Sequence, residues 1–348
     1  MNAYKSFAVT STGGSHIKSG KGCEDNSCEY TDKNAAIAVV SDGHGDDNCF
    51  RSAIGARFAA ECAKNKIKDT VDYFKSKLTS DKIIKGNYPT EDEFCNYIQK
   101  YLVKRIIEAW MKIVEEHYAA NCFTEEELNK VDDKQRVKYL SGKNPNKSGT
   151  TLIKAAKIPP YFKAYGATLI ASAVTTHYWF GLQIGDGRLT ALYEDGSFDQ
   201  PVPLDEKCFL NVTTSICDDD ALDIAHSYFS YSFNKPAPVA VFLCSDGIDD
   251  NYPVKDNGKH LFRLYRTIAL TFAEDGFDST CRQLRDLVDR FAISGKTDDS
   301  SIAGFVDMDG LKRAVPVWNK QIAEEETTPE AITACEKQAD LTGAMANE

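Results

Sequence analysis

Acidic residues stand at the ends of four apolar segments of this chain. Asp42 follows AAIAVVS, Asp186 follows GLQIG, Asp246 follows VFLCS, and Asp298 shortly precedes SSIAGFV. Asp and Gly are ordinary turn residues, so one such turn carries little information. Four of them beside strands of one core bring carboxylates together, and like charges raise one another's pKa unless a cation neutralises them. The pattern predicts a metal centre with oxygen ligands, which select Mg²⁺, Mn²⁺ or Ca²⁺.

Other phosphate and metal motifs fit less well. The segment SDGHG lacks the acidic spacing of an EF-hand calcium loop. HIKSGKG and SGKTDD each contain Gly-Lys, but a nucleotide-binding P-loop needs an earlier glycine where this chain has Ser15 and Arg290. The glycines beside the acids have a different use, because Gly43 and Gly247 let backbone oxygens approach a cation closely.

Composition narrows the function classes. The formal charge of −11 disfavours a nucleic-acid partner, since phosphate backbones are held by concentrated Lys and Arg. The eleven cysteines are scattered without a CxxC pair, which disfavours a zinc ribbon and indicates a reducing compartment. No run of 18 apolar residues and no signal-like N-terminus occur in this sequence. We therefore expect a cytoplasmic monomer without a membrane partner.

The segments that must position these acids show two hydrophobic periodicities, one typical of strands and one typical of helices. Period-two or continuously apolar segments predict strands at 35–41, 300–306 and before Asp246, and three consecutive antiparallel strands over 166–196. Period-four stripes predict helices after Phe50, over 91–118, and at roughly 259–275 and 279–293. Clustered antiparallel strands beside long amphipathic helices are typical of an α+β layered domain.

Three segments fit this scheme less closely. Residues 120–150 are polar and predict a surface insertion with some helix, whereas residues 197–235 look irregular. Residues 311–348 are acidic and rich in Ala, Thr and Glu, which predicts a disordered tail or a docking segment. The expected catalytic domain is therefore 1–310, followed by the tail.

Six short motifs occur in an order that resembles the metal-dependent serine/threonine protein phosphatases of type 2C. They are GCEDNS, SDGHG, YGATLIASAV, IGDGR, LCSDGIDD and TDDSSI, and the resemblance covers residues 8–306. The resemblance implies a four-layer α-β-β-α sandwich, in which two antiparallel sheets are flanked by helix pairs. It also implies a centre of two Mg²⁺ or Mn²⁺ ions, with a third weaker ion in some members, at one edge of the sandwich.

The same resemblance assigns roles to individual residues. It makes Asp42 the ligand that bridges both metals, Gly43 a carbonyl ligand, and Asp246 and Asp298 ligands of one metal. It further implies that Glu24 and Asp25 hold metal-bound waters, and that Asp186 and Asp250 join Asp246 at the third site. Asp249 stands where the family commonly has an aromatic residue, so we expect a solvated neighbour there.

The resemblance also implies a mechanism, and this chain departs from the family pattern at one position. A metal-activated water attacks phosphorus, and His44 resembles the general acid that protonates the departing alkoxide. Many members grip the phosphate with an arginine five residues before the Asp of the ED pair, but this chain has Gly20 there. Its nearby cations are His16, Lys18 and Lys21, and lysine lacks the bidentate fork of arginine.

The function expected first is metal-dependent hydrolysis of phosphoserine and phosphothreonine in a phosphoprotein partner. A catalytically weak relative that binds ligands or scaffolds partners is an alternative, motivated by Gly20 and the acidic tail. A metal-dependent phosphodiesterase or nuclease uses similar acids, but the negative net charge and the motif order disfavour it.

Overall fold

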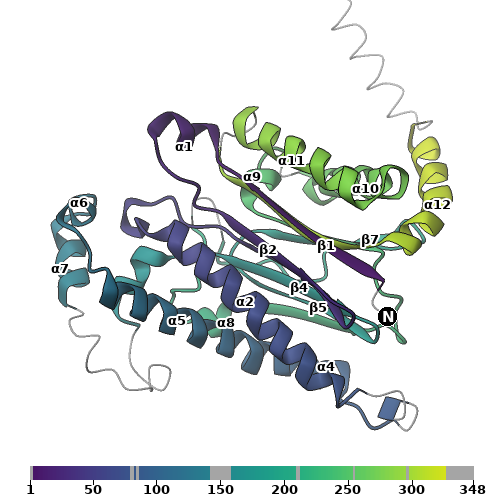
Figure 1. Cartoon of the computed structure of the whole chain (residues 1–348), viewed down its shortest axis with the longest axis horizontal. Coiled ribbons are helices and arrows are strands. Elements are labelled where there is room, and N and C mark those ends of the chain that lie inside the picture. The colour runs from purple at the N-terminus through teal and green to yellow at the C-terminus, as the bar shows by residue number, and fades with distance from the viewer. Residues whose placement is uncertain are drawn as a thin grey trace, which may run out of the picture.

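Two five-stranded antiparallel sheets lie face to face, and helices cover the outer face of each one (Figure 1). The computed structural model describes residues 3–78, 82–83, 86–141, 158–208, 212–253, 255–294 and 298–326. This is the α+β four-layer sandwich that the motifs predict, so the expected fold class is confirmed. The ten cysteines within these ranges are free thiols.

The strands divide between the sheets as follows. The first sheet has the order β1-β10-β9-β6-β7, with bounds Tyr4–Ser11, Ser300–Asp307, Ala240–Cys244, Arg188–Leu192 and Phe198–Asp199. The second has the order β2-β3-β4-β5-β8, with bounds Asn26–Thr31, Ala35–Ser41, Leu169–Thr175, Tyr178–Ile184 and His226–Tyr231.

Strand β3 shows why the apolar run at 35–41 is unbroken. All seven of its residues are buried. Successive side chains point to opposite faces of a sheet, so Ile37 and Val39 pack under the helices while Ala38 and Val40 pack between the sheets. Because both faces are covered, the strand carries a polar side chain only at its last residue, Ser41, whose hydroxyl donates to the carbonyl of Thr168 at 2.6 Å before the chain leaves the sheet at Asp42.

Long amphipathic helices form the two outer layers. The second sheet is covered by α2 (Ser52–Lys75) and by α4 (Glu91–Tyr97), a π-helical turn (Ile98–Leu102) and α5 (Val103–Ala120), which together correspond to the helix predicted at 91–118. Every member of its predicted stripe is buried: Phe94, Ile98, Leu102, Ile106, Trp110 and Val114. The first sheet is covered by α10 (Asn257–Asp275), α11 (Phe277–Ser294) and α12 (Met308–Glu326).

Shorter helices lie mainly near the strand ends that carry the acids. They are α1 (Gly14–Ser19), a 3₁₀ turn at Asp47–Cys49, α6 (Glu125–Leu128), α7 (Asp133–Ser141), a 3₁₀ segment at Pro160–Tyr165, α8 (Ala221–Ile224) and α9 (Asp246–Asp249). Among the described residues, no helix is both long enough and apolar enough to cross a bilayer.

The strand prediction at 166–196 is partly wrong. Strands β4 and β5 do pair, but β6 pairs with β9 and β7 in the other sheet. The turn at Gly185-Asp186-Gly187 therefore crosses from one sheet to the other instead of closing a hairpin. Hydrophobic periodicity predicts that a segment forms a strand, but it does not predict which strand pairs with it.

Two segments are more regular than we expected. Residues 197–235, predicted to be irregular, contain β7, α8 and the edge strand β8. The tail predicted from residue 311 begins inside α12, where Leu311, Ala314 and Trp318 are buried against the first sheet's helices. Residues 311–326 are therefore part of the folded domain, and the rest of the predicted tail, 327–348, lies outside the described residues.

Candidate metal centre and active site

Strand register places Asp25 and Asp42 opposite each other. Strands β2 and β3 pair antiparallel, and their terminal pair is Asn26 with Ser41. One step further along this ladder, Asp25 faces Asp42 across the edge of the second sheet. The residue just before strand β4 holds the same edge, because the Asp42 N–H donates to the Thr168 hydroxyl at 3.0 Å and the Asp42 carbonyl accepts from the Thr168 N–H at 2.7 Å.

The first sheet contributes its acids at the same end of the sandwich. Arg188 pairs with Cys244 in the ladder between β6 and β9, so two residues further Asp186 faces Asp246. Asp298 lies just before β10, whose first residues continue the ladder past Cys244. The negative charges of Asp186 and Asp298 both raise the pKa of Asp246, as expected for carboxylates at the same end of the sheet.

Glycine is required at two points of this edge. A Cβ on Gly43 would lie 2.7 Å from the carbonyl oxygen of Glu24 and 2.8 Å from the backbone of Ser52. A Cβ on Gly247 would overlap the carbonyl oxygen of Asp299. The two glycines thus let the loops from both sheets pack backbone against backbone, with their acids on the open side.

Asp25 is buried, Asp42 and Asp246 are half-buried, and their carboxyl groups contact one another. Asp25 is 5% exposed, and burial, opposed by the hydroxyl of Ser245, raises its pKa to about 7. Burial, together with the neighbouring acids, raises the pKa of Asp246 to about 6. Burial and the charges of Asp25 and Asp246 raise the pKa of Asp42 well above its usual value. For all three, no basic side chain is among the leading influences.

The donor set matches the chemistry of a hard divalent cation. Asp25, Asp42 and Asp246 offer oxygen atoms only, and none of the three forms an ion pair with a basic side chain within the part of the chain that the structure describes. Among the described residues, however, no group of three or more Asp, Glu, His or Cys side chains meets around one point in a way that holds a metal ion. Asp42 instead makes side-chain hydrogen bonds with Asp25 and Asp246.

His44 lies on the loop directly after Asp42 and Gly43. Its backbone N–H donates to the carbonyl of Gly166 at 3.2 Å, and its Nε2 is buried without a hydrogen-bond partner among the described residues. Burial lowers the pKa of His44, while the carboxylates of Asp186 and Asp46 oppose that shift. The imidazole is therefore close to the acidic cluster but is not held by it.

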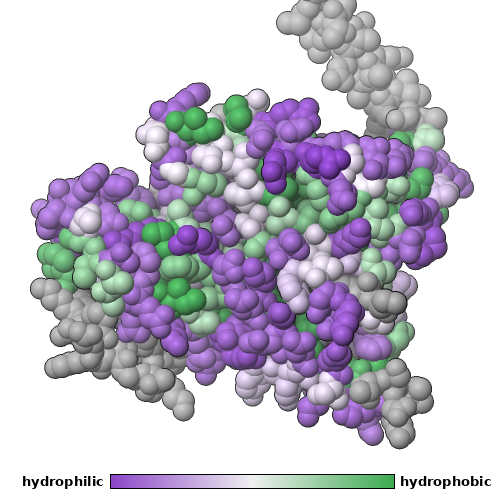
Figure 2. Space-filling model, viewed as in Figure 1, coloured by the Kyte–Doolittle hydropathy of each residue, from purple (hydrophilic) through white to green (hydrophobic). Residues whose placement is uncertain are grey.

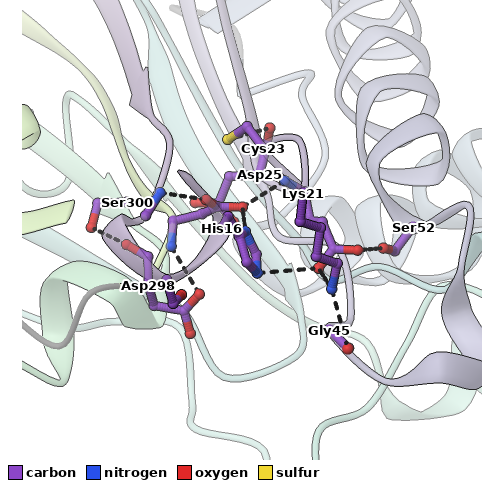
Figure 3. A network of polar contacts seen from close by, with 12 residues as sticks. His16, Lys21, Cys23, Asp25, Gly45, Ser52, Asp298 and Ser300 are labelled. Carbon is purple, nitrogen blue, oxygen red and sulfur yellow. Dashed lines mark hydrogen bonds and ion pairs between the residues drawn. The ribbon is translucent and has the colours of Figure 1, made fainter. Parts of the chain in front are cut away.

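The three basic side chains predicted near Gly20 differ in whether they contact the acidic residues. Figure 3 shows the labelled side chains of His16 and Lys21 turned inward, toward the acidic network. His16 Nδ1 lies 2.9 Å from the carboxylate of Asp299, and Lys21 Nζ lies 2.6 Å from Glu24. The Lys21 side chain remains 40% exposed. Lys18 is exposed on α1 and is not drawn into this network.

Three supporting residues escaped sequence reasoning. Asp299 is buried and accepts hydrogen bonds from the backbone of Gly13 and Glu24, which ties α1 and the ED segment to β10. Ser245 donates to Asp25 at 2.7 Å, and Ser52 of α2 donates to Glu24 at 2.7 Å (Figure 3). Asp299 was visible in the TDDSSI motif, but neither serine carried a signal before its partner was known.

The expectation for Asp249 is wrong. Its side chain is 8% exposed, and its carboxylate pairs with the guanidinium of Arg188 at 3.1 Å. Arg188 also donates to the backbone carbonyl of Asp186 at 2.9 Å, so the pair joins α9 to the turn that crosses between the sheets. Asp250 is exposed, and Asp186 accepts a hydrogen bond from Thr213 at 2.7 Å. Asp249 is therefore a buried member of a structural ion pair on α9, where we expected a solvated side chain.

Compared with known families, the chain matches the model described as protein phosphatase 2C over residues 12–288. No match is found among curated protein sequences.

Solved structures that resemble it include the serine/threonine phosphatase Stp1 from Staphylococcus aureus, 13% identical, TM-score 0.48, covering 87% of this chain and 94% of that one. A C. elegans sex determining protein is 13% identical, TM-score 0.48, covering 92% and 67%. The catalytic domain of PstP in complex with 2 manganese ions is 12% identical, TM-score 0.44, covering 87% and 97%. Likeness at this level carries no argument about chemistry.

Proposed function

Since this chain belongs to the protein phosphatase 2C family, we propose that it hydrolyses phosphoserine and phosphothreonine in proteins with the help of Mg²⁺ or Mn²⁺. The observation that carries the proposal is the group of Asp25, Asp42 and Asp246 at the edge of the sandwich. Their pKa values are raised by burial and by one another, and a divalent cation is the partner that such a group lacks.

The proposed ligands are those that the motifs single out. Asp42, the Gly43 carbonyl, Asp246 and Asp298 would hold two ions directly, and Glu24 and Asp25 would hold them through water. Asp186 and Asp250 would join Asp246 at a weaker third site. Bound divalent ions supply positive charge that offsets the repulsion between a phosphate dianion and the attacking water, and they lower the pKa of that water.

The chain's own residues have separate tasks in this proposal. Among the residues that the structure describes, His44 Nε2 has no competing hydrogen-bond partner, so it is available to give its proton to the leaving serine or threonine oxygen. The side chain of Lys21 is half exposed beside the acidic cluster. Its ammonium group is the cation that approaches the phosphate of the substrate. His16 is bound to Asp299 and therefore helps to balance the charge of the acids. We include residues up to 326 in the catalytic domain, because α12 packs on the first sheet's helices.

The test is release of phosphate from serine- and threonine-phosphorylated peptides with Mn²⁺ or Mg²⁺. We expect Asp42→Ala to abolish activity, while Asp47→Ala, an exposed carboxylate of the same loop, leaves it within twofold. Cleavage of a phosphodiester such as bis-nitrophenyl phosphate in preference to the monoesters would contradict the proposal. A wild-type chain that binds Mn²⁺ without releasing phosphate would favour a binding or scaffold domain instead.

A second measurement tests the role of His44. A proton donor matters most when the leaving group is a poor one, so His44→Ala should slow hydrolysis of phenyl phosphate far more than that of p-nitrophenyl phosphate. The difference should be on the order of 100-fold, at the lower end of the range for general acid catalysis. An equal loss on both substrates would remove His44 from this role.

A further inference from the structure

We propose that residues 121–141, the segment that contains α6 and α7, position the loop that carries His44. This inference rests on the function proposed for His44 and adds a task for a segment that the sequence marks only as a polar surface insertion. Figure 1 shows α6 and α7 beside the end of the sandwich where α1 and the beginning of α2 also lie. The segment therefore stands next to the acidic edge of the sheets.

Arg51 makes the first connection between the segment and the loop. It ends the loop, directly before α2, and its side chain is only 6% exposed. Its guanidinium forms two hydrogen bonds with the carboxylate of Glu127, at 2.7 and 2.9 Å, and donates to the carbonyl of Asn121 at 2.6 Å. It also stacks on the ring of Phe123, 4.7 Å from the centroid. A buried, bidentate arginine pair of this kind fixes orientation as well as distance.

Tyr139 and Phe50 make the second connection. The hydroxyl of Tyr139, a buried residue of α7, donates to the backbone carbonyl of Asn48 in the loop. The ring of Phe50 packs against those of Phe123 and Tyr139, with centroids 4.9 and 5.8 Å away. Three of the last four residues of the loop, 48, 50 and 51, are thus held by the segment.

The opposite side of the loop is held by the chain just before β4. The N–H groups of His44 and Arg51 donate to the carbonyls of Gly166 and Ala164, at 3.2 and 2.7 Å. Since the Nε2 of His44 has no partner among the described residues, the placement of its ring depends on the backbone of the loop. Residues 121–141 hold this loop from the side opposite the chain that precedes β4. Within the segment, Glu127 and Tyr139 are the positioning residues.

Small errors of position have large effects on a catalytic group. A displacement of about 1 Å can cost on the order of 100-fold in rate. We expect partial release of the loop to cost about 10-fold on the substrate that needs His44. The effect on a substrate with a good leaving group should be less than about twofold, because that reaction does not depend on a well-placed proton donor.

The experiment uses Glu127→Gln and Tyr139→Phe, with Glu125→Gln as the matched control. Glu125 is an exposed acid of the same helix, and its partner is Arg136 within the segment. Rates on phenyl phosphate and p-nitrophenyl phosphate are measured with Mn²⁺ in the wild-type and in the His44→Ala background. We expect the two variants, and not the control, to lower the phenyl phosphate rate selectively, and to have no further effect once His44 is absent.

Equal losses on both substrates, or a full additional loss in the His44→Ala background, would overturn the inference. If wild-type protein shows no metal-dependent activity, the proposed function fails instead, and hydrogen exchange still tests the positioning. Amides of residues 44–51 should exchange at least about 10-fold faster in Glu127→Gln than in Glu125→Gln, while β3 and β4 stay protected. Unchanged exchange in the loop would refute the role of the segment.

Discussion

Metal-free protein should lose stability as the pH rises, and the buried carboxyl of Asp25 allows the size of that loss to be worked out. Asp25 is 5% exposed, and burial raises its pKa from 3.8 to about 7. Folding therefore favours the protonated form. Its contribution is fully present below about pH 4 and is lost as the pH rises through about 7.

The magnitude follows from the size of the shift. A change of roughly 3 pKa units corresponds to about 4 kcal/mol of unfolding free energy, at 1.36 kcal/mol per unit. About 3 kcal/mol of this should be lost between pH 5 and pH 8, because the unfolded carboxyl has largely ionised at the lower pH. A divalent ion at 100 times its dissociation constant would restore about 2.7 kcal/mol.

The assay is denaturant unfolding at pH 5 and pH 8, in chelator and in Mn²⁺, for the wild type, Asp25→Asn and the control Asp47→Asn. Subtracting Asp25→Asn from the wild type removes this carboxyl together with its effect on the pKa of Asp42, since asparagine keeps the shape and removes the charge. We expect Asp25→Asn to be more stable than the wild type at pH 8 in chelator, and to gain less from Mn²⁺. A wild-type stability that changes with pH no more than that of Asp25→Asn would refute the reasoning.

Three further outcomes test the packing around the site. Gly247→Ala should abolish Mn²⁺ stabilisation or folding, because the added methyl overlaps the carbonyl of Asp299; wild-type behaviour in a calorimetric titration would contradict this. Trp318→Ala should cost about 3–5 kcal/mol in urea unfolding, since α12 belongs to the core, and a loss below about 1 kcal/mol would place the domain boundary before α12. Arg188→Met should destabilise by roughly 3 kcal/mol by leaving Asp249 buried and unpaired, whereas Arg188→Met with Asp249→Leu should recover most of it.

Much of the fold could be predicted from local patterns. The continuous apolar run at 35–41 indicated a strand covered on both faces, and β3 is buried throughout. The stripe from Phe94 to Val114 indicated one long amphipathic helix, and only the π-helical turn at Ile98–Leu102 was not foreseen. These predictions succeed because burial acts on every second or every fourth residue, which is a signal that the sequence carries directly.

Predictions that depended on distant partners were less successful. Strands β1, β2 and β8 carry mixed polar and apolar residues and were not recognised, and β6 was assigned to the wrong neighbours. Asp249 was expected in solvent, but it is buried on α9 and paired with Arg188 of β6. The segment 120–150 looked like a surface insertion because the anchor of its described part, Arg51, lies some seventy residues away in the chain, and residues 142–150 lie outside the described residues.

The sequence by itself determined which residues are able to do chemistry, because oxygen ligands, a histidine and flexible glycines at strand ends are chemical identities that do not depend on the fold. It also determined most of the elements that carry them, since periodic burial is local. Only the tertiary structure decided that Asp25 faces Asp42 and that Asp186 faces Asp246. Register and the division of strands between two sheets come from pairing over long distances, and the raised pKa values exist only where that pairing removes water from several carboxylates at once.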